Sequence, residues 1–397
     1  MKITDLKCAI IGTSPVVRIV TDEGIDGYGQ GGYTKPFLKP FVEYFRDQLI
    51  GADPTDVERT MLRIRQRGSF KPYGTALSII ENALWDIAGK AAGVPVYKLL
   101  GGKVRDRVAT YNGNLRSPIA ENTPEAYADA MRTMKALPHN FRLVKQGVAF
   151  HSQMKYEPGF YFGTPQPKVS HGILDRGLLT HQGMSHVVEC VTAMKEVLGD
   201  DVMLALDCGP GMMPTDVVRL SEELEHLNIT WLEDTVTGDY TPYVLADVLR
   251  DVTRKSRIPI HTGEQIYLRQ HFRELIETRA VDIIGPDPAD VGGMAEMKWI
   301  AEYADLHGIL IAPHGTGNGL LGLACQVQVG ATMPANFIAF EYPTGNPDWW
   351  YDIVDGLPDP IVVDGEVEVM ERPGMGIELI PEAAKKYLRE EDQGFFD

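Results

Sequence analysis

The pattern of apolar and polar residues separates a strand-rich start from a helical stretch and a long alternating middle. Residues 1–33 contain two β-rich runs, LKCAIIG and PVVRIVTD, and the turn glycines of DEGIDGYGQGG, so they predict a β-meander. Residues 35–100 follow with apolar positions at helical spacing, most clearly in TALSIIENALWDIAGKAAG. Gly93 and Pro95 end that helix. This part of the chain therefore predicts a small sheet followed by helices.

From about residue 108 short apolar runs alternate with helical stretches, which indicates βα units and a parallel sheet. The predicted strands are 108–113, 141–148, 202–208, 229–234, 258–264, 282–287, 309–315 and 337–343. Eight strands with polar residues at nearly every strand end favour a (β/α)8 TIM barrel over a doubly wound sheet. The tail then returns to short β-like runs, PIVVDGEVEVM and GMGIELI, which are expected to pack back on the N-terminal domain.

One gap interrupts the strand–helix period, between the second and third predicted strands. The helix before the third strand is predicted at 183–199, which leaves 149–182 as an insertion rich in aromatic residues, Pro and Gly. An insertion that follows the carboxyl end of a barrel strand lies on the active-site side. We favour a lid or substrate wall over an oligomer contact. The predicted domains are 1–107, 108–349 and a C-terminal segment 350–397.

Composition narrows the function classes. The chain has 397 residues, enough for a barrel of about 250 residues plus a smaller domain. A net charge of −17 argues against a nucleic-acid partner. Four scattered cysteines without a CxxC pair argue against a disulfide framework or zinc site and suit a reducing cytosol. We find neither a signal peptide nor an apolar run of membrane-spanning length, so we expect a cytoplasmic protein without a membrane partner.

Three acidic residues end consecutive predicted strands. Asp207, Glu233 and Glu264 stand in ALDCG, WLEDT and HTGEQ, about one βα unit apart. Neighbouring strands lie about 4.8 Å apart, so the three carboxylates would point at one small volume and need a strong counter-charge. A hard divalent cation such as Mg²⁺ supplies it. The alternative is that each acid separately caps the next helix. Asp234 fits a cap or a supporting role better than a ligand role.

The next two strands end with Asp287 and His314, in GPD and APHG. A hydrogen bond between adjacent strands would fix the tautomer of the histidine and raise its basicity, as a general base or acid near neutral pH requires. The alternative is a lone histidine on the barrel rim. The last strand ends with Glu341, which could contact a substrate carboxylate or hold another residue in place. Lys145 lies near the end of the second strand and could neutralise that carboxylate or abstract a proton, or it could simply face solvent.

Short motifs occur along nearly the whole chain in this order: ALWDIAGK, VKQG, LALDCG, WLEDT, TGEQ, IIGPDPADVGGM, APHGTGNG, AFEYP and PGMGIEL. The ordered set resembles the mandelate racemase subgroup of the enolase superfamily. The resemblance implies a modified TIM barrel under an α+β capping domain formed by both chain ends. It also implies flexible loops that close on the substrate, and Gly12–Pro15 and Gln66–Tyr73 look like those loops.

The resemblance also implies roles for the strand-end residues. Asp207, Glu233 and Glu264 match the Mg²⁺ ligands of the superfamily. Asp287 and His314 match its catalytic dyad. The last strand-end acid, Glu341, matches the residue that contacts the substrate carboxylate. Such sites use a Lys or His base with Mg²⁺ to stabilise an ene-diolate.

The sequence departs from the pattern of the superfamily at one position and lacks one feature that some of its dehydratases have. The second strand of related enzymes often carries Lys-x-Lys, whereas this chain has Gly147 at the second lysine position, which disfavours a two-base racemase. Some related dehydratases place a histidine two residues after the first metal ligand, where this chain has Gly209. The general acid therefore stays open among His314, Lys145 and insertion residues such as His151 or Tyr156.

The leading hypothesis is a Mg²⁺-dependent dehydratase of an acid sugar that removes the proton next to the carboxylate and yields a 2-keto-3-deoxy acid. The long insertion and VKQG are also similar to pentonate dehydratases of the lyxonate type. The first alternative is a racemase or epimerase of a 2-hydroxy acid on the same site. The second is a catalytically inactive barrel that serves as a binding module. By resemblance alone we expect a homo-oligomer, either a dimer or an octamer.

Overall fold

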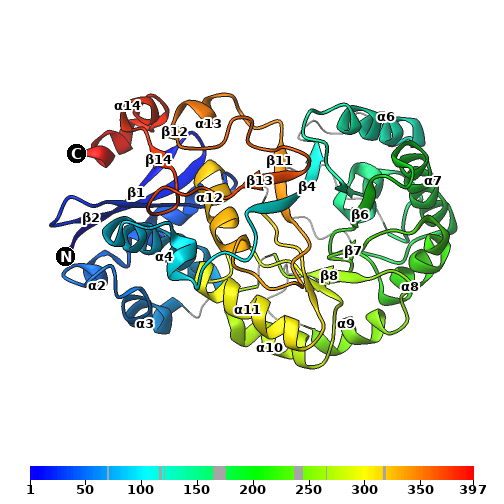
Figure 1. The fold of residues 1–397 in the computed structure, drawn as a ribbon. Coiled ribbons are helices and arrows are strands. Elements are labelled where there is room, and N and C mark those ends of the chain that lie inside the picture. Colours follow the sequence, from blue (N-terminus) through cyan, green and yellow to red (C-terminus); the bar gives the residue numbers. More distant parts are fainter. Residues whose placement is uncertain are drawn as a thin grey trace.

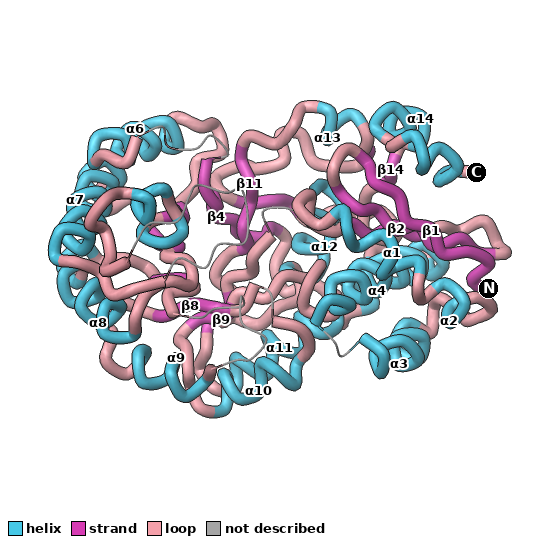
Figure 2. The backbone as a smooth tube through the Cα atoms, turned by 180° about the vertical axis from the view of Figure 1, so that it is seen from behind, coloured by secondary structure: helices cyan, strands magenta, loops and turns pink. Residues whose placement is uncertain are grey.

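The computed structural model describes residues 1–68, 71–115, 119, 121–163, 176–236, 245–264, 266–315 and 319–397. The side chains of residues 67–68, 71–73, 114–115 and 343 are also left out of the description. A barrel forms one side of the molecule and a smaller domain the other, and both chain ends lie on the side of the smaller domain (Figure 1). Seen from behind, the smaller domain again lies apart from the outer barrel helices (Figure 2).

The smaller domain combines a three-stranded antiparallel sheet with helices. The strands β1 (Ile3–Ile11), β2 (Ser14–Thr21) and β3 (Gly27–Gln30) pair in sequence order, which confirms the predicted meander. The long helix α4 (Lys71–Ala92) lies directly on β3, because Gly29 has no side chain: a Cβ there would lie 2.0 Å from the carbonyl oxygen of Ile79. The other helices are α1 (Lys39–Glu43), α2 (Arg46–Leu49), α3 (Val57–Gly68) and α5 (Val96–Leu99).

All eight predicted barrel strands are present. They are β4 (Arg107–Leu115), β5 (Leu143–Gly147), β6 (Met203–Asp207), β7 (Leu232–Glu233), β8 (Ile260–Thr262), β9 (Ile283–Ile284), β10 (Leu310–Ile311) and β11 (Phe340–Thr344). They pair in parallel in the order β10-β9-β8-β7-β6-β5-β4-β11. Backbone bonds from Ile338 N to Ile311 O (2.9 Å) and from Glu341 N to Pro313 O (2.9 Å) join the two ends of that order. The sheet therefore closes, and the predicted barrel is confirmed. Several strands are shorter than predicted, because ladder pairing stops where each chain leaves the sheet for its loop.

Helices follow the strands and surround the barrel. They are α6 (Pro124–Lys135), α7 (His181–Leu198), α8 (Pro214–Glu223), α9 (Ala246–Thr253), α10 (Arg269–Glu277), α11 (Met294–Leu306) and α12 (Gly319–Gly330). The helix predicted at 183–199 is α7, capped by the Thr180 side chain, which accepts a bond from Gly183 N at 3.0 Å. Within the described part of the chain, no helix combines the length and apolar character needed to cross a membrane.

The C-terminal tail contacts both parts of the molecule. Its short elements are α13 (Trp349–Asp352), β12 (Val354–Asp355), β13 (Glu366–Glu368), β14 (Glu378–Leu379) and α14 (Pro381–Ala384). Strand β13 pairs antiparallel with the barrel strand β4, so this part of PIVVDGEVEVM adds to the barrel sheet. The last residues lie on the smaller domain as predicted: Asp392 accepts a bond from Ile10 N at 2.8 Å, and Arg18 donates to Phe395 O at 2.7 Å.

Candidate active site

One layer of buried side chains fills the inside of the barrel. Each strand, or its immediate extension, contributes one of them: Tyr111, Leu143, Ala205, Trp231, His261, Ile283, Ala312 and Ala339. Successive side chains of a strand point to opposite faces, so the residue two positions later faces the interior again, one level nearer the carboxyl end. On five strands that residue is polar: Lys145, Asp207, Glu233, His314 and Glu341. The site is therefore the layer directly above the filled core.

Small residues make room for this layer. At the same level on β4 stands Gly113, and a Cβ there would lie 1.7 Å from Glu341 Oε1. The corresponding position on β9 is Gly285, where a Cβ would lie 2.4 Å from a ring carbon of His261. Gly113 thus lets Glu341 extend across the mouth of the barrel, and Gly285 leaves room for the ring of His261 in the layer below.

A group of three carboxylates at the mouth fits a metal ion. Glu233, Asp234 and Glu264 each offer an oxygen, and these oxygens all lie within 4.8 Å of one another. A donor set made only of oxygen suits a hard cation such as Mg²⁺. Asp207 borders the group, because it is the register partner of Glu233 on the neighbouring strand. It belongs to the same electrostatic cluster, since the negative charges of Glu233 and Glu264 contribute to its raised pKa, after burial.

Asp234 is placed differently from the cap or supporting role that its sequence position suggested. Consecutive strand residues normally face opposite sides, but Asp234 follows the last residue of β7 and has a φ of +48°. This turn brings its carboxylate to the same side as Glu233. Its Oδ1 also accepts a 2.6 Å bond from the Thr262 hydroxyl, which fixes its orientation.

Lys145 lies at the centre of the acids. Its Nζ is 2.7 Å from Glu233 Oε1, 3.3 Å from Glu341 Oε1 and 3.8 Å from Asp207 Oδ2. The side chain is buried, so it does not face solvent as the alternative reading supposed. Burial alone would lower the pKa of Lys145, but the charges of Glu233 and Glu341 outweigh it and raise that pKa well above its ordinary value. The lysine is therefore a cationic group at the mouth of the barrel.

His314 and Asp287 form a hydrogen-bonded pair. The His314 Nδ1 atom lies 2.8 Å from Asp287 Oδ2, and its Nε2 lies 3.4 Å from Glu264 Oε2 and 3.7 Å from Glu341 Oε2. Burial opposes a positive charge on the ring, but the surrounding carboxylates raise the pKa of His314 well above its usual value. The pair leaves Nε2 directed toward the acid cluster.

The insertion contributes His151. Its Nδ1 is 3.2 Å from Asp207 Oδ1, and about a third of the side chain is exposed (38%). The approach depends on Gly209, since a Cβ at that position would lie 2.8 Å from the backbone nitrogen of His151. The histidine thus stands against the strand end that carries Asp207. Tyr156, the other insertion candidate, ends the 3₁₀-helix Gln153–Tyr156.

Sequence reasoning did not single out two groups that hold Glu233. Trp231 Nε1 donates to Glu233 Oε2 at 3.0 Å, and His261 Nδ1 lies 3.4 Å from the same oxygen. The rings of Trp231 and His261 stack with centroids 5.2 Å apart. Strand alternation could have found Trp231, which precedes Glu233 by two residues. No pattern within the short strand IHT marked His261 as its neighbour.

Of the two predicted capping loops, the structure describes Gly12–Pro15 in full and Gln66–Tyr73 only in part. Gly12 begins the turn between β1 and β2, and a Cβ on it would lie 2.5 Å from the ring of Trp349 on α13. Of the segment Gln66–Tyr73, residues 69–70 and most side chains lie outside the described residues.

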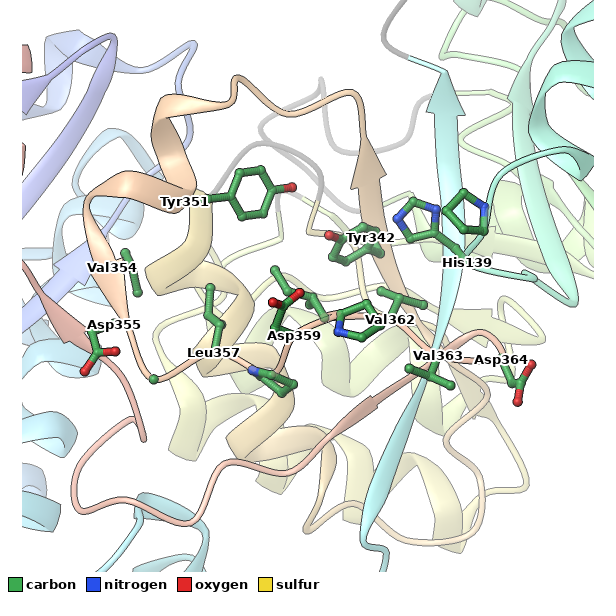
Figure 3. A pocket seen from close by; sticks show the side chains of 15 residues that line it. His139, Tyr342, Tyr351, Val354, Asp355, Leu357, Asp359, Val362, Val363 and Asp364 are labelled. Carbon is green, nitrogen blue, oxygen red and sulfur yellow. The ribbon is translucent and has the colours of Figure 1, made fainter.

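A separate pocket lies on the outer side of β11. It has a volume of about 610 Å³ and lies between the loop before β5 and the tail segment 354–364 (Figure 3). Tyr342 lines it, whereas its neighbour Glu341 belongs to the site described above, as strand alternation requires. The pocket is therefore distinct from the acid cluster, and none of the predicted site residues lines it.

Comparison with known proteins identifies the class. Residues 149–383 match the family model described as enolase C-terminal domain-like, and residues 11–101 match the mandelate racemase / muconate lactonizing enzyme N-terminal domain. The chain belongs to the mandelate racemase / muconate lactonizing enzyme family of the enolase superfamily, which confirms the resemblance seen in its motifs.

Individual relatives cover nearly the whole chain. It is 33% identical to the D-xylonate dehydratase of Haloferax volcanii over 98% of this chain and 89% of the relative. It is 29% identical to a D-mannonate dehydratase of Caulobacter vibrioides over 98% of this chain and 95% of the relative. A solved mandelate racemase/muconate lactonizing enzyme-like protein from Rubrobacter xylanophilus superposes with a TM-score of 0.84 at 31% identity, covering 98% of each chain.

Proposed function

We propose that this protein is a Mg²⁺-dependent hydro-lyase that dehydrates an acid sugar to a 2-keto-3-deoxy acid. The observation that carries the proposal is the joint position of a carboxylate group, a buried lysine and a His–Asp pair at one end of the barrel. The names of the relatives, which include D-xylonate, D-galactonate and D-mannonate dehydratases, support the substrate class.

Asp207, Glu233 and Glu264 are the proposed metal ligands, with Asp234 as a further oxygen donor beside them. When bound, Mg²⁺ would stabilise negative charge on the substrate oxygens and offset the field of the acids around Lys145. The lysine keeps its charge in this setting, so we assign it to the substrate carboxylate rather than to proton abstraction.

His314 is the proposed base. Asp287 holds its Nδ1, so Nε2 is the atom placed to accept the α-proton, and a bound cation would counter the carboxylate charges that otherwise favour the protonated ring. Glu341 lies 3.3 Å from Lys145, close enough to contact the same substrate carboxylate. Its pKa is raised, first by burial, while the neighbouring charges of Lys145 and His314 act in the opposite direction.

Elimination then breaks the bond between the β-carbon and its hydroxyl oxygen. The hydroxyl leaves as water with a proton from a general acid, and the resulting enol collapses to the 2-keto acid. We propose His151 as that acid, since it stands beside Asp207 on a different side of the site from His314. A racemase would need a second base on β5, where the chain has Gly147 at the position of the second lysine.

The test is a screen of acid sugars with Mg²⁺ that reads out 2-keto acid. Pentonates come first, because one relative is a D-xylonate dehydratase and the insertion resembles lyxonate-type enzymes. Formation of 2-keto acid with loss of water supports the proposal. Exchange of the α-proton with solvent deuterium without loss of water would instead favour the racemase. If the protein neither exchanges the α-proton nor binds Mg²⁺, the result would favour an inactive barrel.

Three further proposals follow from sequence. The chain divides at about residues 107 and 349, the protein assembles as a dimer or octamer, and it works in the cytoplasm. Limited proteolysis, analytical ultracentrifugation and cell fractionation would test them in turn.

A further inference from the structure

A polar stripe runs along α4 of the capping domain where this helix faces the barrel. Its members are Thr75, Ser78, Glu81 and Asn82, whose helical spacing places them on one face. Ser78, Glu81 and Asn82 are buried in a helix that is otherwise largely apolar. Buried polar groups are costly unless they are hydrogen-bonded, so their partners should explain why they are there.

All four side chains contact one segment of the barrel, residues 287–295, which comprises the loop after β9 and the first two residues of α11. Asn82 Nδ2 donates to Pro288 O at 3.1 Å, and Ser78 Oγ accepts from Gly292 N at 2.8 Å. The Thr75 hydroxyl donates to Asp290, a carboxylate that also pairs with Lys35 of the capping domain at 2.6 Å. The capping helix thus contacts this loop at three separate points along its length.

Glu81 supplies the fourth contact, at the start of α11. It accepts bonds from Met294 N at 2.8 Å and Ala295 N at 3.1 Å. The N-cap of α11 is Gly293, which makes no side-chain cap bond, so a carboxylate from the other domain satisfies these helix N–H groups. A Cβ on Gly293 would lie 2.0 Å from Glu81 Oε2, so only glycine allows this approach.

The same loop determines how Asp287 is held. Asp287 Oδ1 accepts from Ala289 N at 2.7 Å, and its carbonyl oxygen accepts from Val291 N at 2.7 Å. Its Oδ2 bonds His314 Nδ1 at 2.8 Å. The orientation of the His–Asp pair therefore depends on the backbone of a loop whose other side is bonded to α4.

We propose that Ser78, Glu81 and Asn82 are positioning residues for the His314–Asp287 pair, and that the capping domain acts on proton transfer through them. The inference rests on the proposed function in one respect, that this pair is the base. A displacement of about 1 Å can cost about 10²-fold in rate even when it starts far from the reacting atoms. A role in domain docking alone would change stability and leave the chemical step unaltered.

Asp86 provides the matched control. It is a buried acid on the same helix and accepts backbone bonds from Tyr28 N at 3.1 Å and Met375 N at 2.9 Å. These contacts tie α4 to β3 and to the C-terminal tail. Asp86 also pairs with Lys90 of the same helix at 2.9 Å. A variant at this position therefore weakens the packing of α4 at least as much, away from the segment 287–295.

The experiment compares Ser78→Ala, Asn82→Ala, Glu81→Ala, Glu81→Gln and Asp86→Ala in the full chain with Mg²⁺. We expect kcat for 2-keto acid formation to fall about 10-fold or more in the first three, with KM within about 2-fold. Glu81→Gln keeps one acceptor oxygen and should recover part of the loss. Asp86→Ala should lower Tm but keep kcat within about 2-fold. Hydrogen exchange should accelerate at Gly292 N, Met294 N and Ala295 N in the Glu81 and Ser78 variants and not in Asp86→Ala.

The inference is overturned if folded Ser78→Ala and Asn82→Ala keep the parental kcat, or if Asp86→Ala loses as much kcat at an equal loss of Tm. These two mild variants keep the test decisive if Glu81→Ala does not fold. If the parent dehydrates no acid sugar, the proposed function fails instead. The exchange comparison then still decides whether α4 holds the loop, since unchanged amide exchange in every variant would refute it without any substrate.

Discussion

Two regions of this molecule bury carboxylates, and they satisfy them in different ways. On α4, Glu81 and Asp86 accept bonds from backbone N–H groups of neighbouring segments, and each has one further side-chain donor on its own helix, Trp85 for Glu81 and Lys90 for Asp86. At the barrel mouth, the acids of the metal site and of the His–Asp pair outnumber Lys145 and His314, the basic side chains at their centre. A carboxylate matched to backbone donors fixes a fold, whereas a surplus of carboxylates facing one another calls for a bound cation.

The pKa values of the two regions differ accordingly. Burial raises the pKa of Glu81 to about 7, because its N–H donors only partly offset the loss of water. Burial acts on Glu233 in the same direction, but Lys145 and His261 outweigh it and lower its pKa to about 2. Two equally buried carboxyl groups thus differ: Glu81 of the capping domain has a pKa close to neutral pH, whereas Glu233 at the mouth is ionised at neutral pH.

Removal of the divalent cation should give the largest difference between the two regions, because it affects the barrel mouth and leaves the carboxylates of α4 unchanged. With excess EDTA we expect dehydration to stop and to return on addition of Mg²⁺. In the parent, Mg²⁺ should raise Tm with increasing concentration, because a ligand that binds only the folded state stabilises it. Glu233→Gln should abolish that rise, and Asp86→Ala should keep it. Full activity in EDTA would remove the metal from the proposed mechanism.

Substitution of the proposed base should have the next largest effect. His314→Asn removes the ring that bonds Asp287, and kcat should fall by about 10³-fold, within the range for a lost general base. His139→Asn is the control, since His139 lines the outer pocket of Figure 3 and lies away from the acid cluster. It should keep kcat within about 2-fold. An active His314→Asn enzyme would show that the dyad is wrongly assigned.

Strand alternation explains why so much of the site could be predicted from the sequence. Each polar strand end stands two residues after a side chain that fills the barrel, as Glu233 follows Trp231 and His314 follows Ala312. A period of two is a local property of the chain. It fixes the side that a residue faces without knowledge of the rest of the fold.

The features that escaped prediction depend on irregular backbone or on distant segments. Asp234 joins the acid group through a left-handed backbone conformation that no strand pattern contains. His151 reaches Asp207 across a loop, and Glu81 caps α11 more than two hundred residues further along the chain (|i−j| = 213). The tail strand β13 pairs with β4, although its sequence alone suggested the other domain. Contacts of this kind require the folded arrangement, because either partner alone looks ordinary.

The unusual pKa of Glu81 should appear as a pH-dependent difference in stability. The ordinary value is 4.5 and the folded value is about 7, so between these pH values the unfolded chain loses the proton and the folded chain keeps it. Folding stability from this group therefore falls as pH rises through the window, by about 3 kcal/mol. Glu81→Gln should lack that fall. Urea unfolding of both proteins at several pH values measures it, with Asp86→Asn as control. A difference between parent and Glu81→Gln that is constant across the window would refute the raised pKa.

The smallest expected effect on kcat comes from the contact between Gly209 and His151, which lets the insertion approach the mouth of the barrel. Gly209 has a φ of +64° and contacts the backbone of His151, whereas Gly199 has a φ of +65° with nothing within 4 Å of its Cβ position. Alanine at either site is strained by the positive φ, and more so at Gly199, whose ψ of −151° lies in a region that essentially only glycine adopts, so both variants should lose Tm and Gly199→Ala should lose more. Only Gly209→Ala should also displace His151 from Asp207. We expect its kcat to fall about 10-fold, less than the roughly 10²-fold or more that loss of a general acid costs, because His151 is displaced and not removed, while Gly199→Ala keeps the parental kcat. Equal activity of the two variants would show that the position of His151 does not matter for the leaving hydroxyl, and the general acid would then have to be sought in His314 or Lys145.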